Sequence, residues 1–312
     1  MSILESILLG IVQGIFMFFP VSSTSHLVLT QHWLIQRGSS LPSPESAGMI
    51  LFDLVVHVGT LISIVVVFRK SLTLLLARIW ADAYSIFAGA EMATVNSLEP
   101  RISPWVNRSL LFPQGKRDNS FLYFRLAMLG MLAVVVTGLI GLPMRSLFKT
   151  VFATPLAISI TLSITGFLLW WTDSMKRQQR GSRGLNPWVA TVIGFSQGLA
   201  LIPGLSRSGM TISFALLTGL KRRWAAEFSF FIAFPTILGA TLLQTLDVMG
   251  TNAIASVGIL PLFVGFVVSA IVGVFALQMV LNLLYRAKFR YFSYYLWALS
   301  IAVVVGVYQG VL

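Results

Sequence analysis

Two short segments of the sequence concentrate side chains that could handle a phosphate group. The first follows Pro20, where four consecutive residues, 22–25, carry hydroxyl groups and His26 comes directly after them. Histidine acts as a base or an acid near neutral pH, and a serine within its reach can become a nucleophile. Serines also cap helices, and a histidine in a membrane also bridges helices by hydrogen bonds. Taken alone, this segment leaves catalytic and structural roles equally open.

The second segment follows Pro203 and combines hydroxyl groups with a cation. Ser206, Ser208 and Thr211 surround Arg207, and a helix is expected to begin near Ser208. A guanidinium binds phosphate through paired hydrogen bonds, and the N-terminus of a helix also attracts anions. Because an arginine within an apolar segment is costly, a functional role is favoured over an interfacial one. Together the two segments predict phosphate chemistry.

These segments lie in a chain whose composition requires a membrane. Of its 312 residues, 56% are hydrophobic and only 10% are charged, whereas soluble domains carry about 25% charged residues. So few charges cannot provide a solvated surface, and we predict an all-α polytopic membrane protein. Six apolar runs each approach the roughly 20 residues that a spanning helix needs. They are 49–68, 121–142, 152–171, 228–246, 259–284 and 291–311.

The net charge of +12 would also suit a protein that binds nucleic acid, but the distribution of the cations argues against that partner. The cations form short clusters beside the apolar runs, as in cytoplasmic loops that face anionic lipids. Placing these clusters inside gives a consistent path for the six spans. It leaves two apolar segments, 3–35 and 187–220, that each begin and end on one face. We predict two re-entrant helical hairpins, entering from opposite faces.

The two hairpin segments repeat the same order of residues. Gln13 and Gly14 precede the first proline and hydroxyl cluster, and Gln197 and Gly198 precede the second. Three spans follow each segment, so the second half would be inverted, as in proteins that bind ligands near the midplane. Chance similarity between apolar segments is the alternative. We predict one membrane domain, 1–312, with a first repeat over 1–172 (hairpin 3–35, three spans, cytoplasmic loop 82–115) and an inverted repeat over 187–312 (hairpin 187–220, three spans).

Three further ionisable residues are candidates for the site. Asp53 and His57 lie four residues apart and therefore share one face of a helix. They could pair with each other or line a cavity. Glu227 lies beside cations at the start of a span, where it could also form an interfacial ion pair. For all three, functional and structural roles are evenly balanced.

The motifs Pro20-Val-Ser-Ser-Thr-Ser-His26 and Pro203-Gly-Leu-Ser-Arg-Ser-Gly-Met-Thr211 resemble the two signatures of the undecaprenyl pyrophosphate phosphatase (bacitracin resistance) family. The resemblance covers nearly the whole chain except roughly residues 82–115. It implies hydrolysis of undecaprenyl diphosphate to undecaprenyl phosphate and phosphate, at the outer face of the bacterial cytoplasmic membrane. This reaction recycles the lipid carrier for peptidoglycan and other wall polymers.

The resemblance also implies roles for individual residues. Ser22, Ser23 and His26 fall on catalytic positions of the first motif. The phosphate-binding positions of the second motif are Ser206, Arg207 and Thr211, and we add Ser208 and Gln13 as further substrate-binding candidates.

One position departs from the family pattern. The family normally has Glu or Gln at position 13 and Glu at position 17, whereas this chain has Gln13 and Met17. That glutamate is expected to bind a divalent metal or to act in acid–base chemistry. A thioether does neither, because Mg²⁺ and Ca²⁺ prefer oxygen ligands. The resemblance thus implies Mg²⁺ or Ca²⁺ as a cofactor, Met17 weakens that expectation, and Asp53 and Glu227 are the remaining candidate ligands.

Two other functions stay open beside the phosphatase. The inverted repeat and the missing glutamate would suit a polyprenyl-phosphate translocase. A hydrolysis-deficient member of the family could instead bind lipid phosphate for another envelope enzyme. The expected partners are the lipid diphosphate and the bilayer, with a homodimer as the assembly to test and no nucleic acid.

Overall fold

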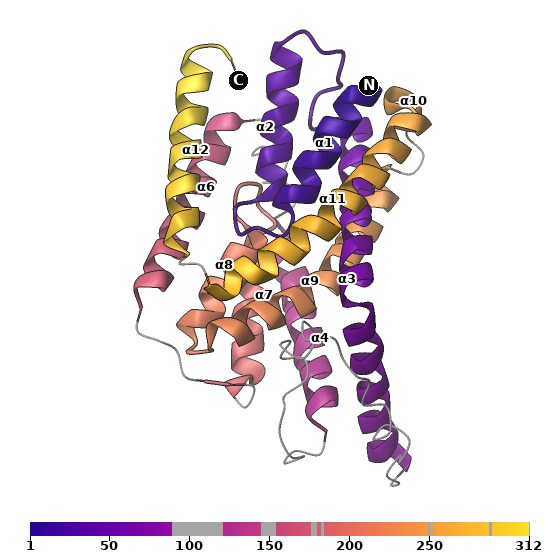
Figure 1. Cartoon of the computed structure of the whole chain (residues 1–312), viewed down its shortest axis with the longest axis vertical. Helices are drawn as coiled ribbons and strands as arrows, with labels where there is room; N and C mark the ends of the chain where they lie inside the picture. Colours follow the sequence, from indigo (N-terminus) through magenta and orange to yellow (C-terminus); the bar gives the residue numbers. More distant parts are fainter. Residues whose placement is uncertain are drawn as a thin grey trace.

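The computed structural model describes residues 1–88, 121–144, 154–175, 180–181, 184–248, 251, 253–286 and 289–311. Its named elements are all helices (Figure 1), and six of them are long and apolar enough to cross a membrane. This finding confirms the prediction of an all-α polytopic membrane protein. The six are α3 (Ala47–Ala88), α4 (Leu122–Gly141), α6 (Pro155–Ser174), α9 (Arg222–Val248), α11 (Ile259–Arg286) and α12 (Arg290–Tyr308).

Two pairs of shorter helices form the predicted hairpin segments. The first pair is α1 (Ile3–Phe16) and α2 (Ser23–Gln36), and the second is α7 (Pro187–Leu199) and α8 (Arg207–Leu217). These helices have 14, 14, 13 and 11 residues. At 1.5 Å per residue, none exceeds about 21 Å, well short of the roughly 30 Å hydrocarbon core of a bilayer. In Figure 1, the first pair occupies the upper half of the molecule and the second the lower half.

Each hairpin packs its first helix against a span from the other half of the chain. In α1, a Cβ added at Gly14 would lie 2.8 Å from the Val272 side chain of α11. In α7, a Cβ added at Gly194 would meet the Ala133 carbonyl of α4. Small residues four apart let helices approach closely in a membrane, and both helices use them, as Gly10/Gly14 and Gly194/Gly198. An inverted repeat would produce such reciprocal packing, but the repeat bounds stay a prediction.

The α3 helix continues beyond Phe68, where its apolar run ends, into the segment predicted as a cytoplasmic loop with some helix. It ends at Ala88, and the predicted cytoplasmic loop begins at residue 82. Asp82 explains the extension, because its Oδ2 accepts hydrogen bonds of 2.9 and 3.1 Å from the backbone N–H groups of Tyr123 and Phe124, at the start of α4. The end of α3 thus supplies partners for a helix N-terminus that would otherwise have none. The remainder of that predicted loop, 89–115, lies outside the described residues.

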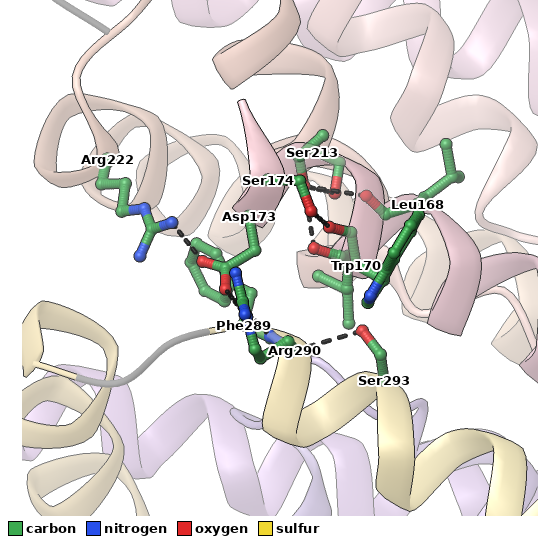
Figure 2. Close-up of polar contacts among 11 residues, drawn as sticks. Leu168, Trp170, Asp173, Ser174, Ser213, Arg222, Phe289, Arg290 and Ser293 are labelled. Carbon is green, nitrogen blue, oxygen red and sulfur yellow. Dashed lines mark hydrogen bonds and ion pairs between the residues drawn. The ribbon is translucent and has the colours of Figure 1, made fainter. Parts of the chain in front are cut away.

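A buried carboxylate joins three helix ends on the predicted cytoplasmic side. Asp173, at the end of α6, pairs with Arg222 at the start of α9 and accepts from Arg290 Nε at 3.0 Å, at the start of α12 (Figure 2). The Asp173 side chain is 2% exposed, and the Arg222 guanidinium also lies 4.8 Å from the centre of the Phe289 ring. Two cations that the sequence assigned only to topology therefore have a structural partner.

We expect the close contact of α7 with α4 to be sensitive to a single methyl group. Gly194→Ala should destabilise the protein by about 1–3 kcal/mol, because the added Cβ overlaps backbone that cannot move away cheaply. Thermal unfolding in detergent measures the effect. Gly138→Ala is the matched control, since a Cβ there meets nothing within 4 Å. Equal unfolding temperatures for the two variants would contradict this account of the packing.

Candidate functional site

The breaks of the two hairpins meet inside the molecule. The Ser208 hydroxyl of the second hairpin donates to the Phe19 carbonyl of the first at 3.3 Å. Beside this contact is a cavity of about 10 Å³, which is room for roughly one water molecule. Its lining comes from both hairpins and from α3 and α9, and consists of Met17, Phe18, Ile64, Arg207, Ser208, Thr211, Ser229, Phe230 and Ala233.

The first loop is shaped by a strained residue. Ser22 precedes α2 with φ of 66°, a left-handed conformation that is uncommon for residues other than glycine and recurs at functional sites. Its carbonyl lies 2.7 Å from Nδ1 of His26, and its hydroxyl is 2.9 Å from the Ser25 hydroxyl. The contact between Ser22 and His26 therefore involves the serine backbone rather than its hydroxyl group.

His26 is enclosed by two aromatic rings. The Phe16 ring stacks on the imidazole with centroids 3.9 Å apart, and the Tyr295 ring lies parallel to it at 5.7 Å. The Tyr295 hydroxyl is 2.7 Å from Nε2 of His26. Sequence reasoning missed Tyr295, because it lies on α12, 269 residues away along the chain, and no local motif marks it.

The hydroxyl of Ser23 contacts sulfur rather than the histidine. Met17 directly follows α1, and its sulfur lies 3.8 Å from the Ser23 hydroxyl and 3.3 Å from Gln13 Nε2. Gln13 is fully buried, and its Oε1 has no hydrogen-bond partner. A buried amide oxygen without a partner is costly, so this atom fits an incoming donor such as water or a protonated phosphate oxygen. Met17 thus occupies the centre of the predicted site.

Two threonines of α6 hold the backbone of the second loop. Thr161 donates to the Pro203 carbonyl at 2.9 Å, and Thr165 accepts from the Ser206 N–H at 3.1 Å. Ser206 then caps α8 by accepting from the Gly209 N–H at 3.2 Å. Both threonines lie in an apolar run that shows no functional pattern, so the sequence did not identify them. The Ser206 hydroxyl also lies 3.4 Å from the Ser208 hydroxyl.

Arg207 begins α8 and points toward the first hairpin. Its Nη2 lies 3.9 Å from the sulfur of Met17, and Thr211 donates to its carbonyl at 2.9 Å. Among the described residues, no carboxylate pairs with this guanidinium. A charge in an apolar environment needs a counterion. The geometry therefore leaves Arg207 able to bind an anion.

The candidate metal ligands do not fit a centre for Mg²⁺ or Ca²⁺ at this cavity, since its lining includes neither Asp53 nor Glu227. The Asp53 carboxylate accepts from Gln31 Nε2 at 3.0 Å, and Glu227 binds Arg223 in its own helix at 3.5 Å. His57 donates through Nδ1 to the Asp53 carbonyl, so its contact is with backbone. Among the described residues, no three His, Asp or Glu side chains group around one point. The thioether of Met17 cannot supply the oxygen ligand that these ions prefer.

Comparison with known proteins agrees with the motifs at this site. The model of the bacitracin resistance protein BacA family matches residues 6–302. The chain belongs to this family. A relative from Alkalilimnicola ehrlichii, named undecaprenyl-diphosphatase, is 53% identical over 299 residues, covering 96% of this chain and 94% of the relative. Relatives of the same name from Halorhodospira halophila and Carboxydothermus hydrogenoformans are 49% and 32% identical, covering 98% of this chain and 98% and 97% of their own lengths. The predicted membership of the BacA family is thereby confirmed.

The support that α6 gives to the second loop leads to a stability prediction. Thr165→Val preserves the shape of the side chain but leaves the buried Ser206 N–H unpaired, which should cost about 1–3 kcal/mol. The unfolding temperature in detergent should fall accordingly. Thr191→Val is the control, because within the described part of the chain the Thr191 hydroxyl bonds to Pro187 of its own helix. A loss as large in the control would show that the loop contact is not the cause.

Proposed function

We propose that this chain is a membrane phosphatase that hydrolyses undecaprenyl diphosphate to undecaprenyl phosphate and phosphate. The observation that carries the proposal is the partly buried guanidinium of Arg207, which lies where the two hairpin breaks meet and has no carboxylate partner among the described residues. The names of the relatives add the substrate. The six helices of membrane-spanning length are consistent with a protein embedded in a bilayer, where a lipid substrate resides.

Substrate binding follows from the chemistry of the second loop. The terminal phosphate would pair with the Arg207 guanidinium, and the hydroxyls of Ser208 and Thr211 line the same cavity. Burial strengthens such charge-assisted hydrogen bonds. The apolar lining residues Phe18, Ile64 and Phe230 suit the isoprenoid chain beside the headgroup. This combination of one cation and apolar walls favours an amphiphile over a free phosphate.

The first loop would supply the attacking group and the base. Either the Ser23 hydroxyl or a water molecule attacks the terminal phosphorus, and His26 takes up the proton. Water attack releases phosphate in one step, whereas serine attack first forms a phosphoserine that water then hydrolyses. The Ser23 hydroxyl lies beside Met17, so its attack would require it to turn toward the bound phosphate. Arg207 stabilises the charge on the phosphoryl oxygens in either route.

The positions of the cations support an orientation for the enzyme. With the cation clusters inside, the first hairpin enters from the outer face of the cytoplasmic membrane, and the lipid diphosphate would be hydrolysed on that side.

The cavity of about 10 Å³ is too small for a diphosphate, so the two hairpins must separate to admit the headgroup. A homodimer stays a prediction.

The proposal is tested by phosphate release from undecaprenyl diphosphate with purified protein, assayed with Mg²⁺, with Ca²⁺ and with a chelator. We expect the wild type to release phosphate and Arg207→Gln to be slower by about 10²-fold or more, because one oriented donor to the developing charge is lost. Arg37→Gln is the matched control, since Arg37 is exposed at the far end of α2. The proposal fails if the wild type releases no phosphate in any of the three buffers. Movement of labelled lipid across vesicles without hydrolysis would instead support the translocase.

Met17 gives a second prediction for the same assay. Met17→Glu places a carboxylate beside Ser23, where it can act as a base and offer oxygen ligands to a cation. Because a positioned acid or base contributes roughly 10²–10⁴-fold, we expect turnover to rise by at least about 10-fold and to respond to Mg²⁺ or Ca²⁺. Met17→Gln, which has a similar shape but no charge, should show neither change. If the glutamate variant is no faster than wild type, this chain does not lack a carboxylate for catalysis.

A further inference from the structure

Tyr295 contacts a ring nitrogen of His26, and the proposed mechanism gives this contact no role. Its hydroxyl lies 2.7 Å from Nε2 of His26, and the two rings are almost parallel, with an angle of 4° between their planes. Tyrosine side chains at the ends of membrane helices commonly serve as interfacial anchors. An anchor would not place its hydroxyl on the imidazole of another element at hydrogen-bond distance, so a more specific role is required.

The two hydrogen bonds of His26 determine which nitrogen carries the hydrogen. Nδ1 faces the Ser22 carbonyl at 2.7 Å, and a carbonyl can only accept. In the neutral imidazole, Nδ1 therefore donates, and Nε2 is left with a lone pair. The Tyr295 hydroxyl must then donate to Nε2. Both ring nitrogens are satisfied, and the basic nitrogen is the one that faces the tyrosine.

The His26 ring is enclosed, and Tyr295 lies on its more accessible side. The His26 side chain is 7% exposed, and Phe16 covers its other face. Tyr295 is 41% exposed. Tyr295 therefore covers the side of the imidazole that is more accessible to solvent, which is the side where Nε2 would take up a proton.

We propose that Tyr295 is a positioning residue for His26. Its hydroxyl keeps the imidazole in the form with hydrogen on Nδ1 and holds Nε2 ready as the base. When the substrate enters, the tyrosine hydroxyl moves off the Nε2 lone pair, which then accepts the proton of the nucleophile. The tyrosine oxygen can afterwards accept a hydrogen bond from the new Nε2–H. One contact therefore serves both charge states of the histidine. This inference rests on the proposed phosphatase function for its kinetic consequence, but not for the hydrogen bond itself.

The hydrogen bond can be tested in the resting protein. The chain has three histidines, so ¹⁵N-histidine labelling gives few signals, and His26→Gln identifies those of His26. We expect Nε2 of His26 to resonate as an unprotonated, hydrogen-bonded nitrogen and to shift in Tyr295→Phe, which removes the hydroxyl and keeps the ring. Tyr294→Phe is the matched control, because the Tyr294 ring packs against Trp297. A His26 spectrum that is identical in Tyr295→Phe and wild type overturns the proposal.

The kinetic test separates positioning from general stability. We expect Tyr295→Phe to lower kcat by about 5- to 10-fold, the effect expected for the loss of one hydrogen bond, with KM unchanged. Tyr294→Phe should match the wild type. In a His26→Gln background, Tyr295→Phe should have no further effect, because the tyrosine acts through the histidine. An additive loss in that background overturns the proposal, whereas a wild type that releases no phosphate counts against the proposed function and leaves the spectroscopic test intact.

Discussion

A helix that breaks within an apolar segment leaves backbone groups that the surrounding protein must satisfy, and both pairs of short helices in this protein contain such a break. Each carbonyl and N–H at the break must find a partner within the protein. At the second break, Thr161 and Thr165 of α6 supply hydroxyls to the loop backbone. At the first break, the imidazole of His26 itself binds the Ser22 carbonyl. The side chains of the site are therefore held in place by the same contacts that make the broken helices tolerable.

The hairpins also depend on close packing across the two halves of the chain. Glycines of α1 and α7 allow these short helices to lie directly on the backbones of α11 and α4. A helix of 13 or 14 residues is too short to cross the bilayer, so this packing is what holds each break in place within the protein. Because each hairpin contacts a span from the opposite half, the two loops meet inside the protein. Ser208 and Phe19 make that meeting direct.

Much of this arrangement could be predicted from the sequence, and the remainder depends on contacts between distant segments. Apolar length predicts the spans, and the proline and hydroxyl clusters predict the breaks. The contact between Asp82 of α3 and the start of α4 could not be predicted, because the two partners lie some forty residues apart in the sequence. Their proximity in sequence suggests that Ser23 pairs with His26. In the structure, the Ser23 hydroxyl instead contacts the sulfur of Met17. Thr165 and Tyr295 lie in ordinary apolar spans, where only the folded structure reveals their partners.

Met17 was visible in the sequence, but its consequence depends on what surrounds it. Its sulfur lies within 3.9 Å of donors from Gln13, Ser23 and Arg207, and a sulfur atom is only a weak acceptor for them. A carboxylate at that position would supply a base, but it would also lie close enough to the Arg207 guanidinium to pair with it when no phosphate is bound. A thioether leaves that positive charge without an internal counterion among the described residues, and the cost of burying it is reduced when an anion enters. The thioether that weakens the case for a metal therefore strengthens the case for anion binding, because both follow from the lack of a negative charge at position 17.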